Sequence, residues 1–223
     1  MAAEKKSDYL VVFVAVGALV IGMIGVGVVM TMKSRRQAAD HEALKAEAAM
    51  RGAMATTGGK VDLGSAPVFS LENARGGTLG TEALKGKIWA VDFFFTSCGS
   101  VCPQMSETMK KIDDKLKDIP EFQLLSITTD PENDTAAKLQ KYAEQYGASE
   151  RWHFLRGSIQ DVMKAQAGFK IGNPENFEQH SAKIVLVDRD GKILGYYDGY
   201  GVDRAAFSDE LIKDVKKLVG VGE

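Results

Sequence analysis

An uncharged run of 24 residues, from Tyr9 to Met32, limits the organisation of this chain more than any other feature. As a helix it would be about 36 Å long at ~1.5 Å per residue, enough to cross a hydrocarbon core of ~30 Å. The alternative, a cleavable signal peptide, should have an apolar region of only ~7–15 residues with small residues close behind it. The nearest such pattern, Ala53–Ala55, lies far downstream. We therefore predict a retained transmembrane anchor at residues 9–32, after a short tail at residues 1–8.

The orientation of this anchor is judged from two conflicting signals. Lys5 and Lys6 precede it and five basic residues follow it, so a positive-inside count would leave the large domain in the cytoplasm. Long domains, however, are translocated largely regardless of charge. The cysteine chemistry described below suits the outer side better. We therefore expect a single-pass protein of the inner (cytoplasmic) membrane, with its large domain facing the periplasm or an equivalent outer compartment.

The rest of the chain divides into a linker and one domain. Residues 33–60 carry six basic and three acidic residues and are rich in alanine, which predicts a mostly polar linker in which His41 is solvated. Residues 61–223 are numerous enough to bury a core as one domain. The net charge of -2 argues against nucleic acid as a partner. Two cysteines exclude a disulfide-rich scaffold and a four-cysteine zinc site.

Strand-like and helical periods alternate within residues 61–223. Apolar, β-rich runs and a turn signal predict strands at 88–95, 122–128, 184–188 and 193–197. Helical spacing predicts helices at 102–116, 134–146 and 202–218. The order is βαβ, a crossover segment and then ββα, which predicts an open α/β sheet covered by helices.

The two cysteines, Cys98 and Cys102, lie where the strongest predicted strand ends and a helix begins. Ligand sites on open α/β sheets gather at the carboxyl ends of strands, and a helix N-terminus lowers the pKa of a thiol. Thiolates select Cu(I), zinc or iron–sulfur clusters, or act as redox nucleophiles. Residues four apart on a regular helix are too distant for a disulfide, so either Cys98 lies in the preceding loop or the pair does not bridge. The remaining alternative is that both thiols are merely buried and unreactive. We disfavour it because the two cysteines of the chain lie together in one short motif.

A third metal ligand is expected from His180, just before the strand at residues 184–188. In a thioredoxin-like sheet, the loop that enters this strand lies beside the turn that carries the cysteines. A neutral imidazole there could complete a copper site with Cys98 and Cys102. We therefore predict that these three residues bind the metal.

Five other candidate residues have structural explanations. Asp130 and Asp134 suit helix N-caps, the first because a proline follows it. Met105 and Met109 follow Cys102 at the spacing with which a helix packs on a sheet. His153 opens a short apolar run. We predict capping roles for the two carboxylates, core positions for the two methionines and a structural role for His153.

The chain resembles the SCO/SenC family over roughly residues 64–219, in addition to the anchor. The resemblance rests on Cys-x-x-x-Cys-Pro at residues 98–103, on Asp-Pro-Glu-Asn-Asp-Thr at residues 130–135, and on His180-Ser181 before a strand and an Asp-x-x-Gly hairpin. Members are membrane-anchored, thioredoxin-like proteins of copper delivery and cytochrome c oxidase assembly. The resemblance implies a thioredoxin-like domain whose Cys98, Cys102 and His180 bind copper, as Cu(I) or Cu(II). It also implies a partner that bears a copper site, either a cytochrome c oxidase subunit or another copper protein.

The sequence departs from the family pattern at two positions. Gly99 stands where the family usually has proline, and Gln179 stands where it often has aspartate. A looser cysteine loop and the loss of a carboxylate partner for the imidazole favour thiol–disulfide chemistry as the alternative to copper delivery. In that alternative, an enzyme would use a redox-active Cys98–Cys102 pair without a metal. A thiol peroxidase does not fit, because the threonine expected three residues before the attacking cysteine is absent. We predict primarily a metallochaperone.

Overall fold

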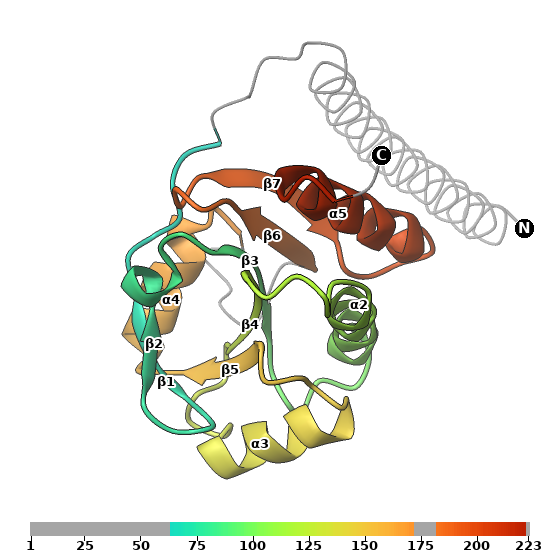
Figure 1. Cartoon of the computed structure of the whole chain (residues 1–223). Coiled ribbons are helices and arrows are strands. Elements are labelled where there is room, and N and C mark those ends of the chain that lie inside the picture. Colours follow the sequence, from blue (N-terminus) through green and yellow to red (C-terminus); the bar gives the residue numbers. More distant parts are fainter. Residues whose placement is uncertain (1–62, 172–181, 222–223) are drawn as a thin grey trace, which may run out of the picture. The chain divides into compact units, whose positions relative to one another are not determined.

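The computed structural model describes residues 63–171 and 182–221, which belong to one compact unit, Asp62–Glu223. Its described part contains a seven-stranded sheet in the order β2-β1-β5-β4-β3-β6-β7 (Figure 1). The strands are β1 (Ser70–Asn73), β2 (Thr78–Gly80), β3 (Ile88–Phe94), β4 (Phe122–Thr128), β5 (Trp152–Arg156), β6 (Lys183–Val187) and β7 (Ile193–Asp198). The helices are α2 (Val101–Lys115), α3 (Ala136–Gln145), α4 (Ile159–Gly168), α5 (Arg204–Leu218) and the short 3-10 helix η1 (Thr81–Leu84).

The centre of the sheet is parallel and its edges are antiparallel. Strands β3, β4 and β5 run in the same direction, whereas β6 and β7 on one side and β1 and β2 on the other run antiparallel to their neighbours. Every residue of β3 and β4 is buried, as expected for parallel strands that are covered on both faces. The predicted α/β sheet covered by helices is therefore confirmed.

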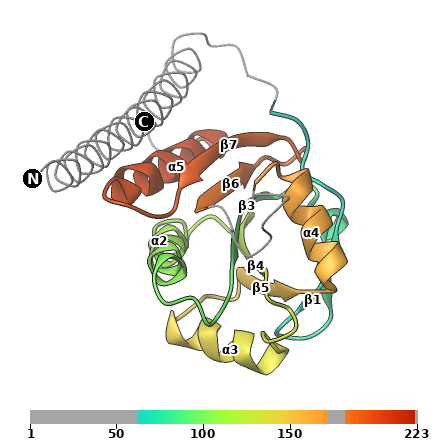
Figure 2. The same ribbon diagram turned by 180° about the vertical axis from the view of Figure 1, so that it is seen from behind.

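Two hydrophobic cores lie on opposite faces of the sheet, each covered by its own helices. Helices α2, α3 and α5 cover one face, and α4 covers the other, as the two views in Figures 1 and 2 show. Successive side chains of β3 alternate between the cores, because a strand has a period of two. Ala90 and Phe94 pack in the first core, and Val91 and Phe93 pack in the second. Cys102, a residue of α2, belongs to the first core.

The crossover segment contains a strand and a helix that the sequence patterns did not reveal. Strand β5 is only five residues long, and the polar side chains of His153 and Arg156 interrupt its apolar pattern. Helix α4 is capped by Ser158, whose hydroxyl accepts a hydrogen bond from the backbone N–H of Asp161 at 3.2 Å. The short strands β1 and β2 were also not predicted, since four and three residues carry too little periodicity.

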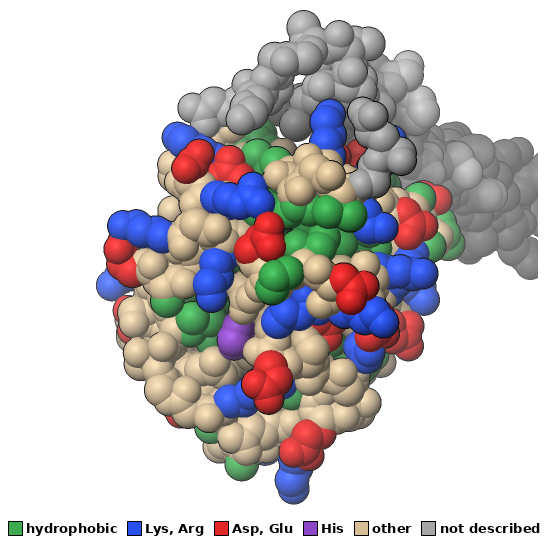
Figure 3. All heavy atoms as spheres, in the orientation of Figure 1, with side chains coloured by type: hydrophobic (Ala, Val, Ile, Leu, Met, Phe, Trp, Pro, Cys, Tyr) green, Lys and Arg blue, Asp and Glu red, His purple; other side chains and the backbone are tan. Residues whose placement is uncertain are grey.

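On the face of the domain that Figure 3 shows, acidic and basic side chains are interspersed rather than segregated.

The described residues contain no candidate for a membrane-spanning segment. Across residues 63–171 and 182–221, none of the helices is both long enough and apolar enough to span a bilayer. The anchor predicted at residues 9–32, like the linker with His41, lies outside the described residues.

Candidate metal and redox site

The chain leaves the buried end of β3 through a tight turn that carries the first cysteine. The backbone N–H of Cys98 donates to the carbonyl oxygen of Phe95 at 3.2 Å, and α2 begins three residues later, at Val101. Cys98 therefore lies in the loop, whereas Cys102 is the second residue of the helix. This is the arrangement that a bridge between the two cysteines requires, and in this structure no disulfide joins them.

The sulfur of Cys98 takes the place of a helix cap. The first N–H groups of an α-helix have no partner within the helix and are usually satisfied by a side-chain oxygen at the N-cap. Ser100 occupies the N-cap position of α2, but its side chain makes no capping hydrogen bond. Instead, the backbone N–H of Cys102 donates to Sγ of Cys98 at 3.3 Å. The positive end of the α2 dipole therefore faces this sulfur and favours its anionic form.

The two thiols have opposite electrostatic environments. Partial burial works to raise the pKa of Cys98, but hydrogen bonds from the Ser100 N–H, the Cys102 side chain, and the N–H groups of Cys102 and Val101 outweigh it and lower that pKa overall. Burial raises the pKa of Cys102 far above its ordinary value, and the side-chain hydrogen bond with Cys98 and the charge of Asp92 raise it further. The site thus combines the half-buried sulfur of Cys98, which favours the thiolate, with the buried thiol of Cys102, which keeps its proton.

Asp92 is a buried carboxyl near the cysteines that our sequence analysis missed. Its Oδ1 accepts a hydrogen bond from the Ser126 hydroxyl at 2.6 Å, and Oγ of Ser126 in turn accepts one from Nε1–H of Trp152 at 2.9 Å. Burial raises the pKa of Asp92 to about 7, against the lowering effect of the Ser126 hydrogen bond. The available signal was a carboxylate inside an otherwise apolar strand, since such groups are rarely fully buried without a reason.

The predicted third ligand, His180, lies outside the described residues, in the interval 172–181. Strand β6 is antiparallel to β3, so the beginning of β6 lies at the edge of the sheet where β3 ends. The N–H of Gly199 donates to the carbonyl oxygen of Ala182 at 2.8 Å and holds the chain at this edge. Within the described part of the chain, no three histidine, cysteine, aspartate or glutamate side chains converge to hold a metal. The role of His180 therefore stays a prediction.

The prediction that Asp130 and Asp134 cap a helix was wrong. Helix α3 begins at Ala136, and its N-cap is Thr135, whose hydroxyl accepts from the backbone N–H of Lys138 at 3.3 Å. A hydroxyl at the residue directly before the helix supplies the cap, so neither carboxylate is needed there.

The two carboxylates instead organise the loop between β4 and α3. The carboxylate of Asp130 accepts hydrogen bonds from the side-chain amide of Asn133, at 2.9 and 3.1 Å, and closes a turn. The carboxylate of Asp134 faces the interior, where it accepts hydrogen bonds from Thr96 and Thr128. Thr96 belongs to the turn that carries Cys98, so Asp134 links this loop to the cysteine site.

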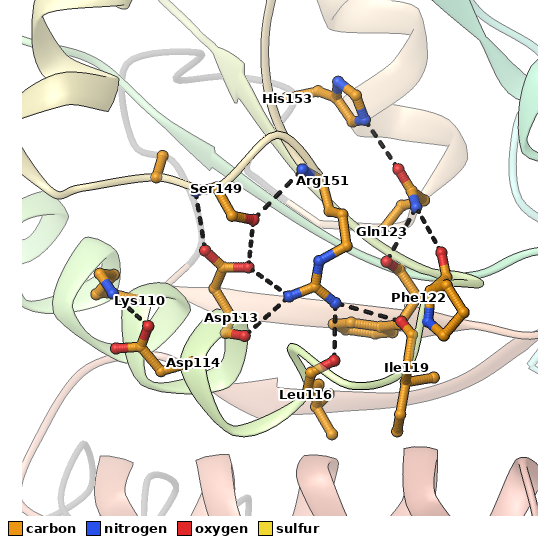
Figure 4. A network of polar contacts seen from close by, with 12 residues as sticks. Lys110, Asp113, Asp114, Leu116, Ile119, Phe122, Gln123, Ser149, Arg151 and His153 are labelled. Carbon is orange, nitrogen blue, oxygen red and sulfur yellow. Dashed lines mark hydrogen bonds and ion pairs between the residues drawn. The ribbon is translucent and has the colours of Figure 1, made fainter.

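The structural roles predicted for the methionines and for His153 are confirmed. Met105 and Met109 belong to α2, and their side chains are fully buried. Nδ1 of His153 accepts from the Asn73 amide at 3.1 Å, and its Nε2–H donates to Oε1 of Gln123 at 3.0 Å (Figure 4 shows the second contact). Burial, followed by nearby positive charges, lowers the pKa of His153 to about 4, so this ring is neutral. It lies near the start of β5, whereas the cysteines follow the end of the parallel strand β3, so the two lie at opposite ends of the strands.

Comparison with known proteins agrees with this fold. The family model described as SCO1/SenC matches residues 59–219. The SCO1 protein homolog of Bacillus subtilis (strain 168) is 36% identical over 156 residues, which are 66% of this chain and 79% of that protein. BsSco, a member of the Sco family of cytochrome c oxidase assembly proteins in which a disulfide switch was identified, matches with a TM-score of 0.62 and 33% identity over 73% of this chain and 98% of its own.

A more distant match shows the fold alone. Yeast Sco1 with copper bound has a TM-score of 0.55 and 23% identity, over 68% of this chain and 88% of its own. Together with BsSco, it confirms that the α/β domain is thioredoxin-like. The family model covers well over half of the sequence, from before the first described strand to the end of the last helix. The chain therefore belongs to the SCO1/SenC family.

Proposed function

We propose that this chain is a copper metallochaperone that assists the assembly of a copper site of cytochrome c oxidase. One observation carries the proposal: the half-buried sulfur of Cys98 accepts hydrogen bonds from backbone N–H groups at the start of α2 and from the buried thiol of Cys102. Soft sulfur donors of this kind select Cu(I). Membership of the SCO1/SenC family supports the proposal, since yeast Sco1 of that family has been solved with copper bound.

Copper is the cargo in this proposal, and three residues would hold it. Cys98 is the accessible ligand, and its lowered pKa makes it available as a thiolate. Cys102 must release its proton to the solvent when copper binds, because its pKa is raised. His180 would supply a neutral nitrogen as the third ligand. A recipient protein would then displace the three ligands in turn, because a three-coordinate ion leaves one side open to attack.

The departure from the family pattern at Gly99 is not a steric requirement of the cysteine loop. Gly99 is exposed, and a Cβ atom added there would meet nothing within 4 Å. The loop therefore does not need glycine for space, and its conformation is held by hydrogen bonds on either side. The second departure, Gln179, lies outside the described residues.

Anaerobic titration with Cu(I) against a chromophoric chelator tests the copper proposal. Residues 59–223 suit this experiment, because they contain the compact unit with both of its cores and the whole family match. We expect one tightly held copper per reduced chain. Cys98→Ser and Cys102→Ser should each abolish tight binding, because one thiolate cannot hold a two-sulfur site. His180→Ala should weaken binding at least tenfold, roughly 1.4 kcal/mol.

The matched control is His153→Gln, which replaces the other histidine of this fragment. His153 lies near the start of β5, at the end of the parallel strands away from the cysteines, so this variant should bind copper as the unmodified protein does. Binding that is indifferent to His180, or to either cysteine, would contradict the three-ligand site.

A second function, thiol–disulfide exchange, is favoured by the asymmetry of the two thiols. An attacking cysteine should be accessible and anionic, and a resolving cysteine should lie behind it and stay protonated until the mixed disulfide forms. Cys98 and Cys102 have these properties. In this reaction the Cys98 thiolate attacks a substrate disulfide and releases one thiolate, then Cys102 attacks the mixed disulfide, so the substrate is reduced as the Cys98–Cys102 disulfide forms.

Alkylation of single-thiol variants tests this asymmetry. We expect iodoacetamide to label Cys98 in the Cys102→Ser variant with a midpoint below pH 9. Cys102 in the Cys98→Ser variant should react at least tenfold more slowly until the protein is unfolded, because it is fully buried. Mass spectrometry of samples quenched between pH 5 and pH 10 measures both rates. Equal rates for the two cysteines would contradict the assignment of an attacking and a resolving thiol.

The membrane arrangement is part of the same proposal. Residues 9–32 would anchor the domain in the inner membrane, with the cysteines facing the periplasm or an equivalent outer compartment. The partner would be the subunit of cytochrome c oxidase that carries a copper site, or another copper protein on the same side. The long uncharged run supports the anchor.

A further inference from the structure

The carboxylate of Asp134 is buried between the end of β4 and the turn that follows β3. Asp134 is 1% exposed. Its Oδ2 accepts hydrogen bonds from the backbone N–H of Thr96 at 3.0 Å and from the Thr128 hydroxyl at 2.5 Å, and its Oδ1 accepts one from the Thr96 hydroxyl. Removing a buried acceptor that meets three donors would leave all of them unpaired. This side chain therefore holds the turn and the strand end in one arrangement.

Thr96 is the point at which the cysteine turn is held. The hydrogen bond from Cys98 N–H to the Phe95 carbonyl makes Thr96 and Ser97 the central residues of the turn. Asp134 engages both the backbone N–H and the hydroxyl of Thr96, so this residue cannot rotate freely. Cys98 follows two residues later, and its sulfur must lie where the Cys102 N–H reaches it.

The loop that carries Asp134 is itself held in place from β5. Nε of Arg156 donates to the carbonyl oxygen of Asp134 at 3.0 Å, and Nη2 donates to that of Pro131 at 2.9 Å. The remaining nitrogen, Nη1, lies 2.7 Å from Oε2 of Glu72 on β1. A planar guanidinium suits such multiple contacts because its donors have a fixed geometry. Asp134 therefore reaches the cysteine turn from a braced loop.

We propose that Asp134 is a positioning residue for the metal and redox site. It acts through Thr96, and its hydrogen bonds fix the turn that holds the Cys98 sulfur against the first N–H groups of α2. This inference rests on the proposed function of Cys98 and Cys102, and it assigns Asp134 no contact with the metal. The hydrogen bonds of its carboxylate, and not its negative charge, are the property that matters.

Replacing Asp134 in two ways separates hydrogen bonding from charge. Asparagine can keep all three contacts: its Oδ1 accepts from the Thr96 N–H and the Thr128 hydroxyl, while its Nδ2 donates to the Thr96 hydroxyl oxygen. Alanine keeps none of them. Thr135→Ala is the matched control, because it removes the cap of the adjacent helix α3 and costs stability without touching the cysteine turn.

The experiment measures Cu(I) affinity and amide hydrogen exchange on reduced residues 59–223. We expect Asp134→Ala to weaken Cu(I) binding at least tenfold and to speed exchange of the Thr96 and Cys98 amides at least tenfold. Asp134→Asn should stay within threefold of the unmodified protein in both measurements, and Thr135→Ala should leave both unchanged. If Asp134→Ala does not fold, Thr96→Val should speed exchange at Cys98 and Thr96→Ser should not.

Three outcomes would overturn the proposal. Asp134→Asn as impaired as Asp134→Ala would assign the effect to charge. Asp134→Ala with normal exchange and affinity, or Thr96→Val behaving like Thr96→Ser, would show that the turn holds without the carboxylate. An equal effect of Thr135→Ala would reduce the role to general stability. If the unmodified protein binds no copper, the proposed function fails, and the amide exchange still decides the role of Asp134.

Discussion

Replacing Arg151 with methionine is expected to lower the free energy of unfolding by about 3–5 kcal/mol, because it leaves a buried carboxylate without its partner. Asp113 is 2% exposed, and Nη2 of Arg151 lies 2.9 Å from its Oδ1. The same guanidinium donates to the carbonyl oxygens of Asp113, Leu116 and Ile119, which lie at the end of α2 and just beyond it (Figure 4). The substitution therefore leaves the Asp113 carboxylate without a cation, held only by the hydrogen bonds from Ser149, and removes one donor from each of the three carbonyl oxygens.

Urea unfolding of residues 59–223, followed by tryptophan fluorescence, measures this effect. The matched control is Arg189→Met, which removes an ion pair with Glu121 at the surface, where both side chains are more than a third exposed. That variant should lose less than about 1 kcal/mol. A loss for Arg151→Met no larger than that of the control would contradict the prediction. Copper affinity should be unchanged in the folded variant, because this network lies at the end of α2 away from the cysteines.

Replacing Asp92 with asparagine is expected to stabilise the protein by about 4 kcal/mol at pH 8, since one pKa unit corresponds to about 1.4 kcal/mol. Burial raises the pKa of Asp92 from 3.8 to about 7. The folded protein therefore holds this proton more tightly than the unfolded chain does. The stability that the protonated Asp92 carboxyl contributes is fully present below pH 4. It is lost as the pH rises through about 7, where this buried carboxyl must ionise. Asparagine does not titrate and can still accept the Ser126 hydrogen bond through its oxygen.

Unfolding free energies measured between pH 4 and pH 8.5 test both the size and the sign of this effect. The difference between Asp92→Asn and the unmodified protein should grow across the interval from pH 4 to pH 7 and then level off. Asp161→Asn is the control, because it makes the same substitution at an exposed carboxylate on α4. A difference that is constant with pH would show that ionisation of Asp92 is not its cause.

Local periodicity was sufficient to predict most elements that position the site. The prediction of a strand at residues 122–128 coincides with β4, and those for β3, α2, β6 and β7 differ from the structure by one residue at the affected ends. These segments are long or strongly apolar, so their pattern is visible in the sequence alone. The short strands β1, β2 and β5 form because neighbouring strands supply their hydrogen bonds, and no local pattern records those neighbours.

The sequence alone determined that both cysteines lie at the junction of a buried strand and a helix, because strand and helix periods change at that point in the chain. Only the tertiary structure decided what surrounds them. Asp134 lies 38 residues from Thr96, and Asp92 lies 34 residues from Ser126, yet each pair shares a hydrogen bond. The hydrogen-bond partners of neither carboxylate can be identified from the sequence. Burial against distant donors gives them their roles, because the desolvation of a carboxylate and the partners that offset it depend on how the strands are arranged in the sheet.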